Sequence, residues 1–363
     1  MCHIYPQKAV FHIDVNNAYL SWSAVELLKN GAKTDLRKIP SIIGGDPKKR
    51  HGVVLAKSTP AKQYGIQTGE TVSSAKKKCS MLRVVQPDRI LYQHSSNKLI
   101  EVLSCFSSEI TRFSIDECFM EYKNKEFDSI LEAAHYIRQT IYHELGFTVN
   151  IGISTNRLLA KMASDFQKPD RVHTLFEWEM EQKMWPLPIN ELFMVGRASR
   201  EKLKQKGFFT IGDIARSSPV LLERILKKHG VTLNNYANGK ETAHFLSHDT
   251  VKGISHSTTL PFDTNDFEYI RKVLMELSEK IARRLKQKEL YFGLVSIEVK
   301  TEDFKKRSIQ KRLQIPTNDT ALIYQTALEL FEHLNIKKNI RHLGIRIGNL
   351  EHPYQQVCFC NEI

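Results

Sequence analysis

Three acidic residues, distant from one another in the chain, are the strongest candidates for chemistry. Asp14 follows the apolar run 9–13, and Asp116 and Glu117 are adjacent much later. Buried among apolar neighbours, carboxylates are costly unless a cation neutralises them. Together the three would suit two Mg²⁺ ions shared with substrate phosphates. Taken alone, the Asp116 and Glu117 pair is better explained as the turn of a water-exposed hairpin.

Two further segments carry groups that could bind phosphate. Lys161 lies beside an apolar helical face, and Thr59 and Lys62 lie at a predicted helix start. A lysine ammonium binds phosphate as a point charge, and a first helical turn offers free backbone N–H groups. By spacing alone, Lys161 is more commonly a solvated lysine on a helix. Thr59 and Lys62 are more commonly a helix-capping hydroxyl and a surface lysine.

The pattern of apolar residues predicts an α+β chain in which these groups stand at the ends of elements. Short apolar runs predict strands at 9–13, 52–56 and 148–154 and a hairpin over 113–122. Helical spacing predicts helices at 16–28, 97–106, 131–145 and 158–166 and a mainly helical stretch over 178–239. The C-terminal part predicts strand, helix, two strands, helix and strand, with a helix at 266–288 and a strand at 311–315.

Composition and charge restrict the class of protein. A chain of 363 residues with 41% hydrophobic and 26% charged residues predicts two or more folded domains and excludes wholesale disorder. We expect no membrane segment, no leader and a cytoplasmic protein. The net charge of +13 favours a polyanionic partner, nucleic acid first. The six cysteines form no C-x-x-C motif, so we expect reduced thiols.

Four segments, in order along the chain, resemble the Y-family DNA polymerases, the translesion enzymes, and within them the DinB-like (DNA polymerase IV) branch. They are residues 11–19 (FHIDVNNAY), 53–66 with STPAKQYG at 58–65, 113–119 (FSIDECF), and 150–169 with LAKMAS at 159–164. The third is the most specific. Each of these matches could arise by chance, but four matches in this order, followed by a basic C-terminal part, are too many for coincidence.

This resemblance implies a right-hand polymerase of α+β class. The palm would comprise residues 1–17 and 83–171, and the fingers 18–82. A helical thumb with a helix-hairpin-helix would span 172–243, followed by a linker at 244–252. An α+β little finger would cover 253–350 and a tail 351–363.

The resemblance also assigns the metal ligands. Asp14, the backbone carbonyl of Val15, Asp116 and Glu117 would hold two Mg²⁺ ions. Asp14, Asp116 and Glu117 would be the catalytic residues, with Glu117 nearest the primer 3′-hydroxyl.

A third set of implied roles concerns the incoming nucleotide. Tyr19 matches the steric gate that would clash with a ribose 2′-hydroxyl. The alternative is a helix-face aromatic of the core, but the position of Tyr19 in the motif favours the gate. Asn17 and Ala18 would donate backbone N–H groups to the phosphates. The triphosphate contacts would be made by the side chains of Thr59, Lys62 and Lys161.

Some positions depart from the family pattern. Asn16 replaces a frequent second acid, Thr59 a tyrosine, Lys62 an arginine and Ala18 an aromatic residue. Lysine lacks the two-pronged fork of arginine, so the grip on the triphosphate is expected to differ.

The implied contacts to DNA lie further along the chain. Gly196 and Arg197 would open a helix-hairpin-helix that binds duplex phosphate through backbone N–H groups. Met194 stands where a second glycine is frequent. Lys252 would contact DNA ahead of the little finger, which the resemblance makes a DNA-gripping domain. Residues 355–359 (QQVCF) faintly resemble a sliding-clamp peptide, and a plain polar tail explains them equally well.

These inferences predict a monomeric translesion DNA polymerase that acts on primer-template DNA and deoxynucleoside triphosphates. Two alternatives belong to other classes. A catalytically weak DNA-binding scaffold would act through clamp or repair partners, and intact Asp14, Asp116 and Glu117 argue against it. Another two-metal enzyme, such as a nucleotide cyclase, would not need the helical hairpin or the basic last domain.

Overall fold

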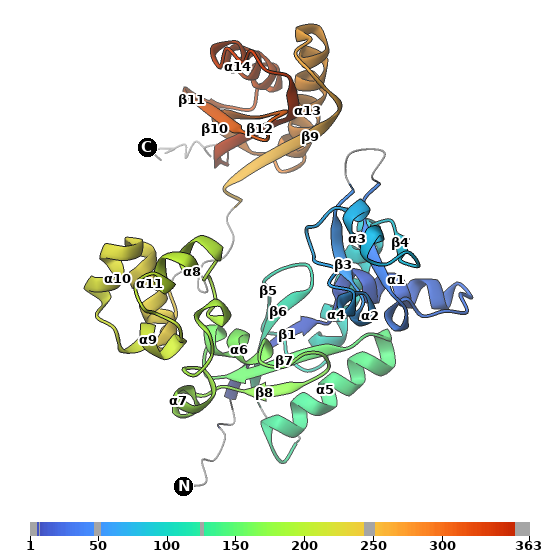
Figure 1. The fold of residues 1–363 in the computed structure, drawn as a ribbon, viewed down its shortest axis with the longest axis vertical. Coiled ribbons are helices and arrows are strands. Elements are labelled where there is room, and N and C mark those ends of the chain that lie inside the picture. The colour runs from blue at the N-terminus through green and yellow to red at the C-terminus, as the bar shows by residue number, and fades with distance from the viewer. Residues whose placement is uncertain (1–5, 7, 47–51, 124–126, 243–250, 353–363) are drawn as a thin grey trace, which may run out of the picture. The chain divides into compact units, whose positions relative to one another are not determined.

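The computed structural model describes residues 6, 8–46, 52–123, 127–242 and 251–352 (Figure 1). The chain divides into two compact units. The first comprises Met1–Gly45 and Gly52–Ser247, and the second is formed mainly by His248–Ile363. The predicted linker falls largely on residues outside this description, and so does the clamp-like peptide at 355–359. Among the described residues no helix has both the length and the apolar character needed to cross a bilayer.

A five-stranded sheet carries the acidic residues of the first unit. Its order is β5-β6-β1-β7-β8, and β1 runs antiparallel to both β6 and β7. The strands are β1 (Lys8–Val15), β5 (Ile110–Arg112), β6 (Glu117–Lys123), β7 (Val149–Ser154) and β8 (Val172–Thr174).

The two faces of this sheet are covered by different helices. Alternation along β1 turns Phe11 and Ile13 into the core shared with α4 (Arg89–Ser104) and α5 (Ile130–Leu145). His12 faces the opposite side, where its ring contacts Ser164 at the end of α6 (Arg157–Ser164). Asp14 has the same parity as His12, so its carboxylate belongs to the α6 side.

Gly152 of β7 allows α6 to approach this sheet closely. A Cβ atom at this position would lie 1.9 Å from the carbonyl oxygen of Ala160 and 2.4 Å from the backbone nitrogen of Ser164. Only glycine fits such a backbone contact without a shift of the helix. The side chain of Asn156 caps the start of α6 by accepting from the Leu159 N–H.

A smaller three-stranded sheet, ordered β3-β2-β4, follows α1 (Ala18–Lys29). Its strand β2 (Ser41–Gly44) pairs antiparallel with β3 (Val54–Lys57) and parallel with β4 (Arg83–Val85). The short helices α2 (Thr59–Gln63) and α3 (Val72–Lys78) belong to this region, whose core includes Ile42, Val54, Ala61, Ile66, Val72 and Ala75.

A helical segment, defined here as residues 177–237, completes the described part of the first unit. It comprises η3 (Glu177–Glu179), α7 (Met180–Lys183), η4 (Ile189–Glu191), α8 (Arg197–Lys204), α9 (Ile211–Arg216), α10 (Pro219–Leu226) and α11 (Lys228–Ala237). Met194, just before α8, adopts φ +72°, in the left-handed region that favours glycine. The position where the family often has a second glycine therefore keeps a glycine-like backbone.

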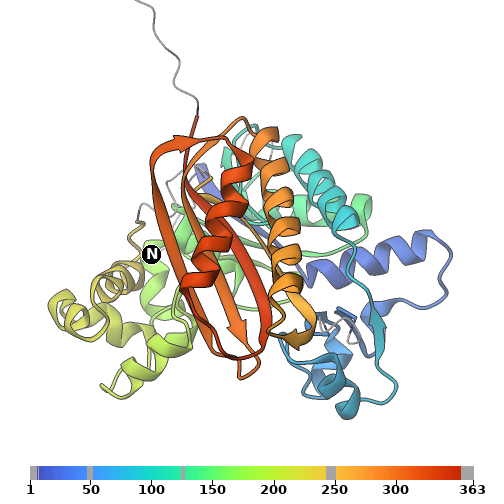
Figure 2. The same cartoon turned by 90° about the horizontal axis from the view of Figure 1, so that it is seen from above.

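The second unit is a four-stranded antiparallel sheet with two helices on one face, as the sequence predicts. Its order is β11-β10-β12-β9, and Figure 2 shows the two helices side by side over the sheet. The elements are β9 (Gly253–Thr264), α13 (Phe267–Gln287), β10 (Tyr291–Thr301), β11 (Lys306–Thr317), α14 (Thr320–His333) and β12 (Ile340–Glu351).

Three predicted elements were too short. The hairpin predicted at 113–122 begins with β5 at Ile110, and residues 113–116 form its turn. The helix predicted at 97–106 begins at Arg89, because Asp88 caps two further turns whose side chains are largely polar. The strand predicted at 311–315 covers Lys306–Thr317, because this sheet-edge strand is mostly exposed and polar and lacks an apolar signal.

Candidate active site

A cavity of about 610 Å³ collects most of the residues that the sequence assigns to metal and nucleotide. The cavity is lined by Asp14, Val15, Asn17, Ala18, Tyr19, Thr59, Lys62, Asp116 and Glu117. Lys161, the remaining residue of those two sets, is absent from the lining. The cavity thus joins β1 and β6 of the larger sheet to α1, β3 and α2.

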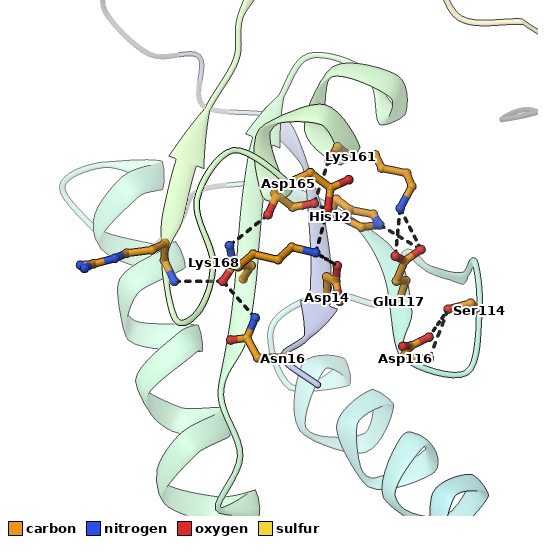
Figure 3. A network of polar contacts seen from close by, with 12 residues as sticks. His12, Asp14, Asn16, Ser114, Asp116, Glu117, Lys161, Asp165 and Lys168 are labelled. Atoms are coloured by element: carbon orange, nitrogen blue, oxygen red, sulfur yellow. Dashed lines mark hydrogen bonds and ion pairs between the residues drawn. The ribbon is translucent and has the colours of Figure 1, made fainter. Parts of the chain in front are cut away.

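The register of two neighbouring strands brings the acidic residues together. Asp14 on β1 stands directly opposite Glu117 on β6, and the Val15 N–H donates to the Asp116 carbonyl over 3.0 Å. Opposite residues of an antiparallel pair have Cβ atoms roughly 4.5–5.5 Å apart. Figure 3 shows the carboxylates of Asp14 and Glu117 on the same side of the sheet.

Asp14 is buried and carries a perturbed charge. Burial raises the pKa of its carboxyl to about 6, and the ion pair with Lys168 opposes that rise. The Lys168 ammonium also contacts Asp165 at 2.7 Å. The pKa of Lys168 lies above its ordinary value because these two carboxylates outweigh its burial.

The pKa of Glu117 is shifted in the direction opposite to that of Asp14. Lys161 donates to both of its carboxylate oxygens over 2.9 Å. The Nε2 atom of His12 lies 3.8 Å from Glu117 Oε2, beyond hydrogen-bond distance. Although burial raises the pKa of Glu117, these neighbours outweigh it and lower that pKa to about 2.

Asp116 turns its side chain toward its own loop. Ser114 Oγ donates to Asp116 Oδ1 over 2.6 Å. Within the described part of the chain, no three acidic, histidine or cysteine side chains stand close enough to hold a metal as placed. The donor set nevertheless fits Mg²⁺, because the cavity gathers three carboxylates and the Val15 backbone, and oxygen donors are the ligands that this ion prefers.

The candidate nucleotide residues Tyr19, Thr59 and Lys62 line the same cavity. Tyr19 of α1 stacks on Tyr92 with ring centroids 4.6 Å apart and planes 11° apart. Thr59 is the first residue of α2, and the helix cap is the neighbouring Ser58, which accepts from the Ala61 N–H. Lys62 follows one turn later on the same short helix.

Two cavity lysines were missing from the sequence-based candidates. Lys168 lines the cavity beside Asp14, and Lys57 lines it from β3 while donating to the Ile66 carbonyl over 2.6 Å. The KP pair at 168–169 was part of the quoted family motif, so Lys168 had a sequence signal. Lys57 had none beyond a lysine-rich surrounding.

Asn16, which departs from the family pattern, has a structural role. Its amide donates to Asn150 Oδ1 over 3.1 Å and its oxygen accepts from the Asp170 N–H over 2.9 Å. Asn150 in turn donates to the carbonyls of Ser164 and Gln167. These bonds fix the loop that carries Lys168 over Asp14.

The candidate DNA contacts are exposed. Gly196 precedes the first residue of α8, Arg197, and a Cβ at Gly196 would meet nothing within 4 Å. Lys252 is exposed just before β9, in the second unit. These three assignments stay predictions.

Comparison with known proteins shows the family of this chain. Residues 13–165 match the model of the impB/mucB/samB family, and residues 251–357 match the model of that family's C-terminal domain. The chain therefore belongs to this family, the Y-family DNA polymerases. It is a DNA-directed DNA polymerase of the translesion type, similar to proteins named DNA polymerase IV.

Three of those relatives illustrate the similarity. DNA polymerase IV of Clostridium acetobutylicum is 45% identical over 94% of this chain and 87% of its own length. The Acetivibrio thermocellus protein of the same name is 36% identical over 95% and 86%. DNA polymerase IV 1 of Bacillus subtilis is 33% identical over 96% and 84%.

Solved structures agree with the fold. A Y-family chimera of the polymerases Dbh and Dpo4 superimposes with a TM-score of 0.82 at 21% identity, covering 95% of this chain and all of that one. A Dbh ternary complex gives 0.62 over the same shares. The right-hand α+β architecture expected from the sequence is confirmed.

Proposed function

We propose that this chain extends a primer 3′-hydroxyl at the cavity between β1, β6 and α2, using Asp14, Asp116 and Glu117 as its catalytic carboxylates. The observation that carries the proposal is the register of β1 on β6, which sets Asp14 opposite Glu117. The same cavity holds Tyr19, Thr59 and Lys62. One space therefore has anionic groups for cations and cationic groups for phosphates.

The metal is proposed to be Mg²⁺, as two ions. Asp14, the Val15 carbonyl, Asp116 and Glu117 would hold them, all through the oxygen ligands that hard cations prefer. When bound, Mg²⁺ supplies charge neutralisation for the phosphates and the attacking oxygen. Asp116 would leave Ser114 to join this set.

The chain's own cations are proposed to bind the triphosphate. Lys62 and Lys168 lie on the cavity wall, and Thr59 adds a hydroxyl at the start of α2. An ammonium beside phosphate neutralises charge that develops during phosphoryl transfer. Lys168 would exchange its contact with Asp14 for one with phosphate once a cation occupies Asp14. The backbone N–H groups of Asn17 and Ala18 are proposed as further donors.

Sugar selection is proposed to rest on Tyr19. Its ring lines the cavity and is fixed from behind by the stacked ring of Tyr92. A rigid aromatic wall can exclude an added hydroxyl by steric contact. Ala18 stands where the family pattern has an aromatic residue, and its small side chain leaves more room beside the Tyr19 ring.

The remaining proposals concern partners and location. Gly196, Arg197 and Lys252 are proposed to contact the backbone of primer-template DNA, since they are exposed and the chain is strongly basic. We propose a monomer that acts in the cytoplasm, where the free thiols of Cys79, Cys105 and Cys118 stay reduced. A sliding clamp would bind through the tail at 355–359.

Primer extension of Asp116→Asn and Glu117→Gln tests the proposed function. Both variants should lose incorporation with Mg²⁺ while their DNA affinity stays close to that of the unsubstituted protein. Retained incorporation by either variant would remove that carboxylate from the reaction. The scaffold alternative predicts that the unsubstituted protein fails to extend a primer at all.

A further inference from the structure

Lys161 is a buried lysine whose ammonium contacts Glu117, and Lys161 itself does not line the cavity described above. Its side chain is 8% exposed, and its ammonium lies 2.9 Å from each carboxylate oxygen of Glu117. Of the described lysines, Lys57, Lys62 and Lys168 line the cavity. The position of Lys161 therefore suits an action on Glu117 better than a contact with the triphosphate.

Two aromatic rings hold this ammonium from other sides. It lies 5.2 Å from the ring centroid of Phe113 and 5.7 Å from that of Phe193. Phe113 precedes the loop that carries Asp116, and Phe193 lies between η4 and α8 in the helical segment. The face of an aromatic ring attracts a cation, most strongly where water is excluded.

The ring of Phe193 is itself fixed on two sides. Its centroid lies 6.3 Å from that of Phe113 and 6.0 Å from that of Tyr236, a buried residue of α11. The helical segment thus contacts the loop between β5 and β6 through Phe193, close in sequence to the start of α8. A shift of the helical segment would move the ring against which Lys161 rests.

We propose that Lys161 is a positioning residue that holds the Glu117 carboxylate toward the cavity, and that Phe193 sets the place of its ammonium. Through this contact the helical segment controls the orientation of the Glu117 carboxylate. The inference rests on the proposed function, because it takes Glu117 as a carboxylate that acts on the reacting groups.

The expected kinetic effect follows from the geometry. The second near group, His12, lies beyond hydrogen-bond distance of Glu117, so Lys161 alone fixes both carboxylate oxygens among the contacts described. Without the ammonium, Glu117 regains rotamer freedom, and small misplacement of a reacting group is costly. Nucleotide affinity should hardly change, since the cavity wall stays intact.

Lys161→Met is the first variant, measured by steady-state primer extension at saturating Mg²⁺. Loss of a group that orients a metal ligand typically costs roughly 10- to 100-fold in activity, and we expect kcat to fall by this factor. The KM for nucleotide should change by less than about 2-fold. A raised KM with unchanged kcat would place Lys161 on the triphosphate and overturn the inference, and an unchanged kcat would also overturn it.

Phe193 is tested with a matched set of variants. Phe193→Leu keeps apolar bulk but removes the ring, and it should lower kcat by roughly 3- to 30-fold. Phe193→Tyr keeps the ring and should stay close to the unsubstituted rate. Phe208→Leu is the control, because Phe208 belongs to the same apolar cluster and contacts no cation among the described cation–ring pairs.

The double variant Lys161→Met/Phe193→Leu shows whether the two residues act as one unit. If Phe193 acts through Lys161, the double variant is no slower than Lys161→Met alone. Effects that multiply would overturn the part assigned to Phe193. If Lys161→Met does not fold, the comparison of Phe193→Leu with Phe193→Tyr tests the inference instead. Equal loss of kcat in these two variants would refute it.

Two measurements separate this inference from the proposed function. If Glu117→Gln keeps its turnover, the proposed role of Glu117 is wrong, and the inference about Lys161 fails with it. If Glu117→Gln is inactive while Lys161→Met turns over normally, only the present inference fails. In metal-free thermal unfolding, the losses caused by Lys161→Met and Glu117→Gln should not add, and additive losses would contradict their contact.

Discussion

Asp14 and Glu117 stand opposite each other on β1 and β6, yet their carboxyl groups have pKa values displaced in opposite directions. Burial dominates at Asp14 and raises its pKa to about 6. At Glu117 the neighbours His12 and Lys161 outweigh burial and lower the pKa to about 2. The two carboxylates therefore contribute to folding with opposite signs, which gives a stability test that needs no substrate.

Asp14→Asn should stabilise the metal-free protein at pH 7.5. Because the folded pKa of Asp14 lies above its ordinary value of 3.8, its ionised form costs stability, and this cost grows as pH rises through about 6. Removing the charge should raise the free energy of unfolding by up to about 3 kcal/mol. Lys168 keeps Asp165 as a partner. Urea unfolding in a chelator, at pH 7.5 and pH 4, measures the effect, which should shrink to about 0.5 kcal/mol at the lower pH.

Glu117→Gln should act in the opposite direction under the same conditions. The folded pKa of Glu117 lies below its ordinary value of 4.5, so its stabilising contribution is present above that pH and is lost as pH falls toward 2. The variant should lose about 3 kcal/mol at pH 7.5, since Lys161 is left buried without its carboxylate. Equal signs for the two variants would contradict the electrostatic description of this pair.

Lys168→Met should weaken nucleotide binding. Its ammonium lines the cavity together with Lys62, and a hydrogen bond to a charged group contributes about 1.5–3 kcal/mol. The KM for nucleotide should rise by roughly 10- to 100-fold, with a smaller change in kcat. Steady-state kinetics at saturating DNA measures both constants. An unchanged KM would show that Lys168 stays with Asp14 during the reaction.

Tyr19→Ala should relax the choice of sugar. Loss of the ring opens the space in which a ribose 2′-hydroxyl would clash, and discrimination by one pocket contact is worth roughly 10- to 200-fold. The ratio of kcat/KM for ribo- and deoxynucleotides measures it. Tyr92→Phe is the control, because it keeps the stacked ring and removes only the hydroxyl that contacts Ser23. Unchanged sugar selection in Tyr19→Ala would remove the steric-gate assignment.

Gly152→Ala should disturb both folding and the site. The added Cβ would collide with the backbone of α6, the helix that carries Lys161 and leads into the Lys168 loop. Overpacking of this kind costs about 1–3 kcal/mol or more. Thermal unfolding should show the loss, whereas Gly196→Ala, with open space around its Cβ, should melt normally. A normal melting temperature for Gly152→Ala would mean that α6 can retreat without cost.

The sequence predicted the strands that carry chemistry better than the side-chain partners. The apolar run before Asp14 and the motif around Asp116 and Glu117 both mark β-structure, and their register then follows from the sheet. The order of elements in the second unit was also predictable, because its core residues keep strand and helix periods. The prediction made the edge strand β11 too short, because most of its residues are exposed and therefore show no apolar periodicity.

Contacts between distant segments were beyond the sequence. The motif around Lys161 predicts a triphosphate contact, and it gives no sign that the ammonium contacts Glu117, 44 positions away. Nothing local to Lys161 indicates that Phe193 lies over it, since that contact depends on how the helical segment packs. The bracing of the Lys168 loop by Asn16 and Asn150 likewise depends on tertiary packing.

Anomalous scattering from Mn²⁺, in crystals with primer-template DNA and an incoming nucleotide, tests the central claim most directly. The account predicts two manganese peaks between Asp14, Asp116 and Glu117, with the Asp116 carboxylate turned away from Ser114 and Lys168 moved from Asp14 toward phosphate. Manganese bound elsewhere, with Asp14 still paired to Lys168 and Asp116 still bonded to Ser114, would contradict it.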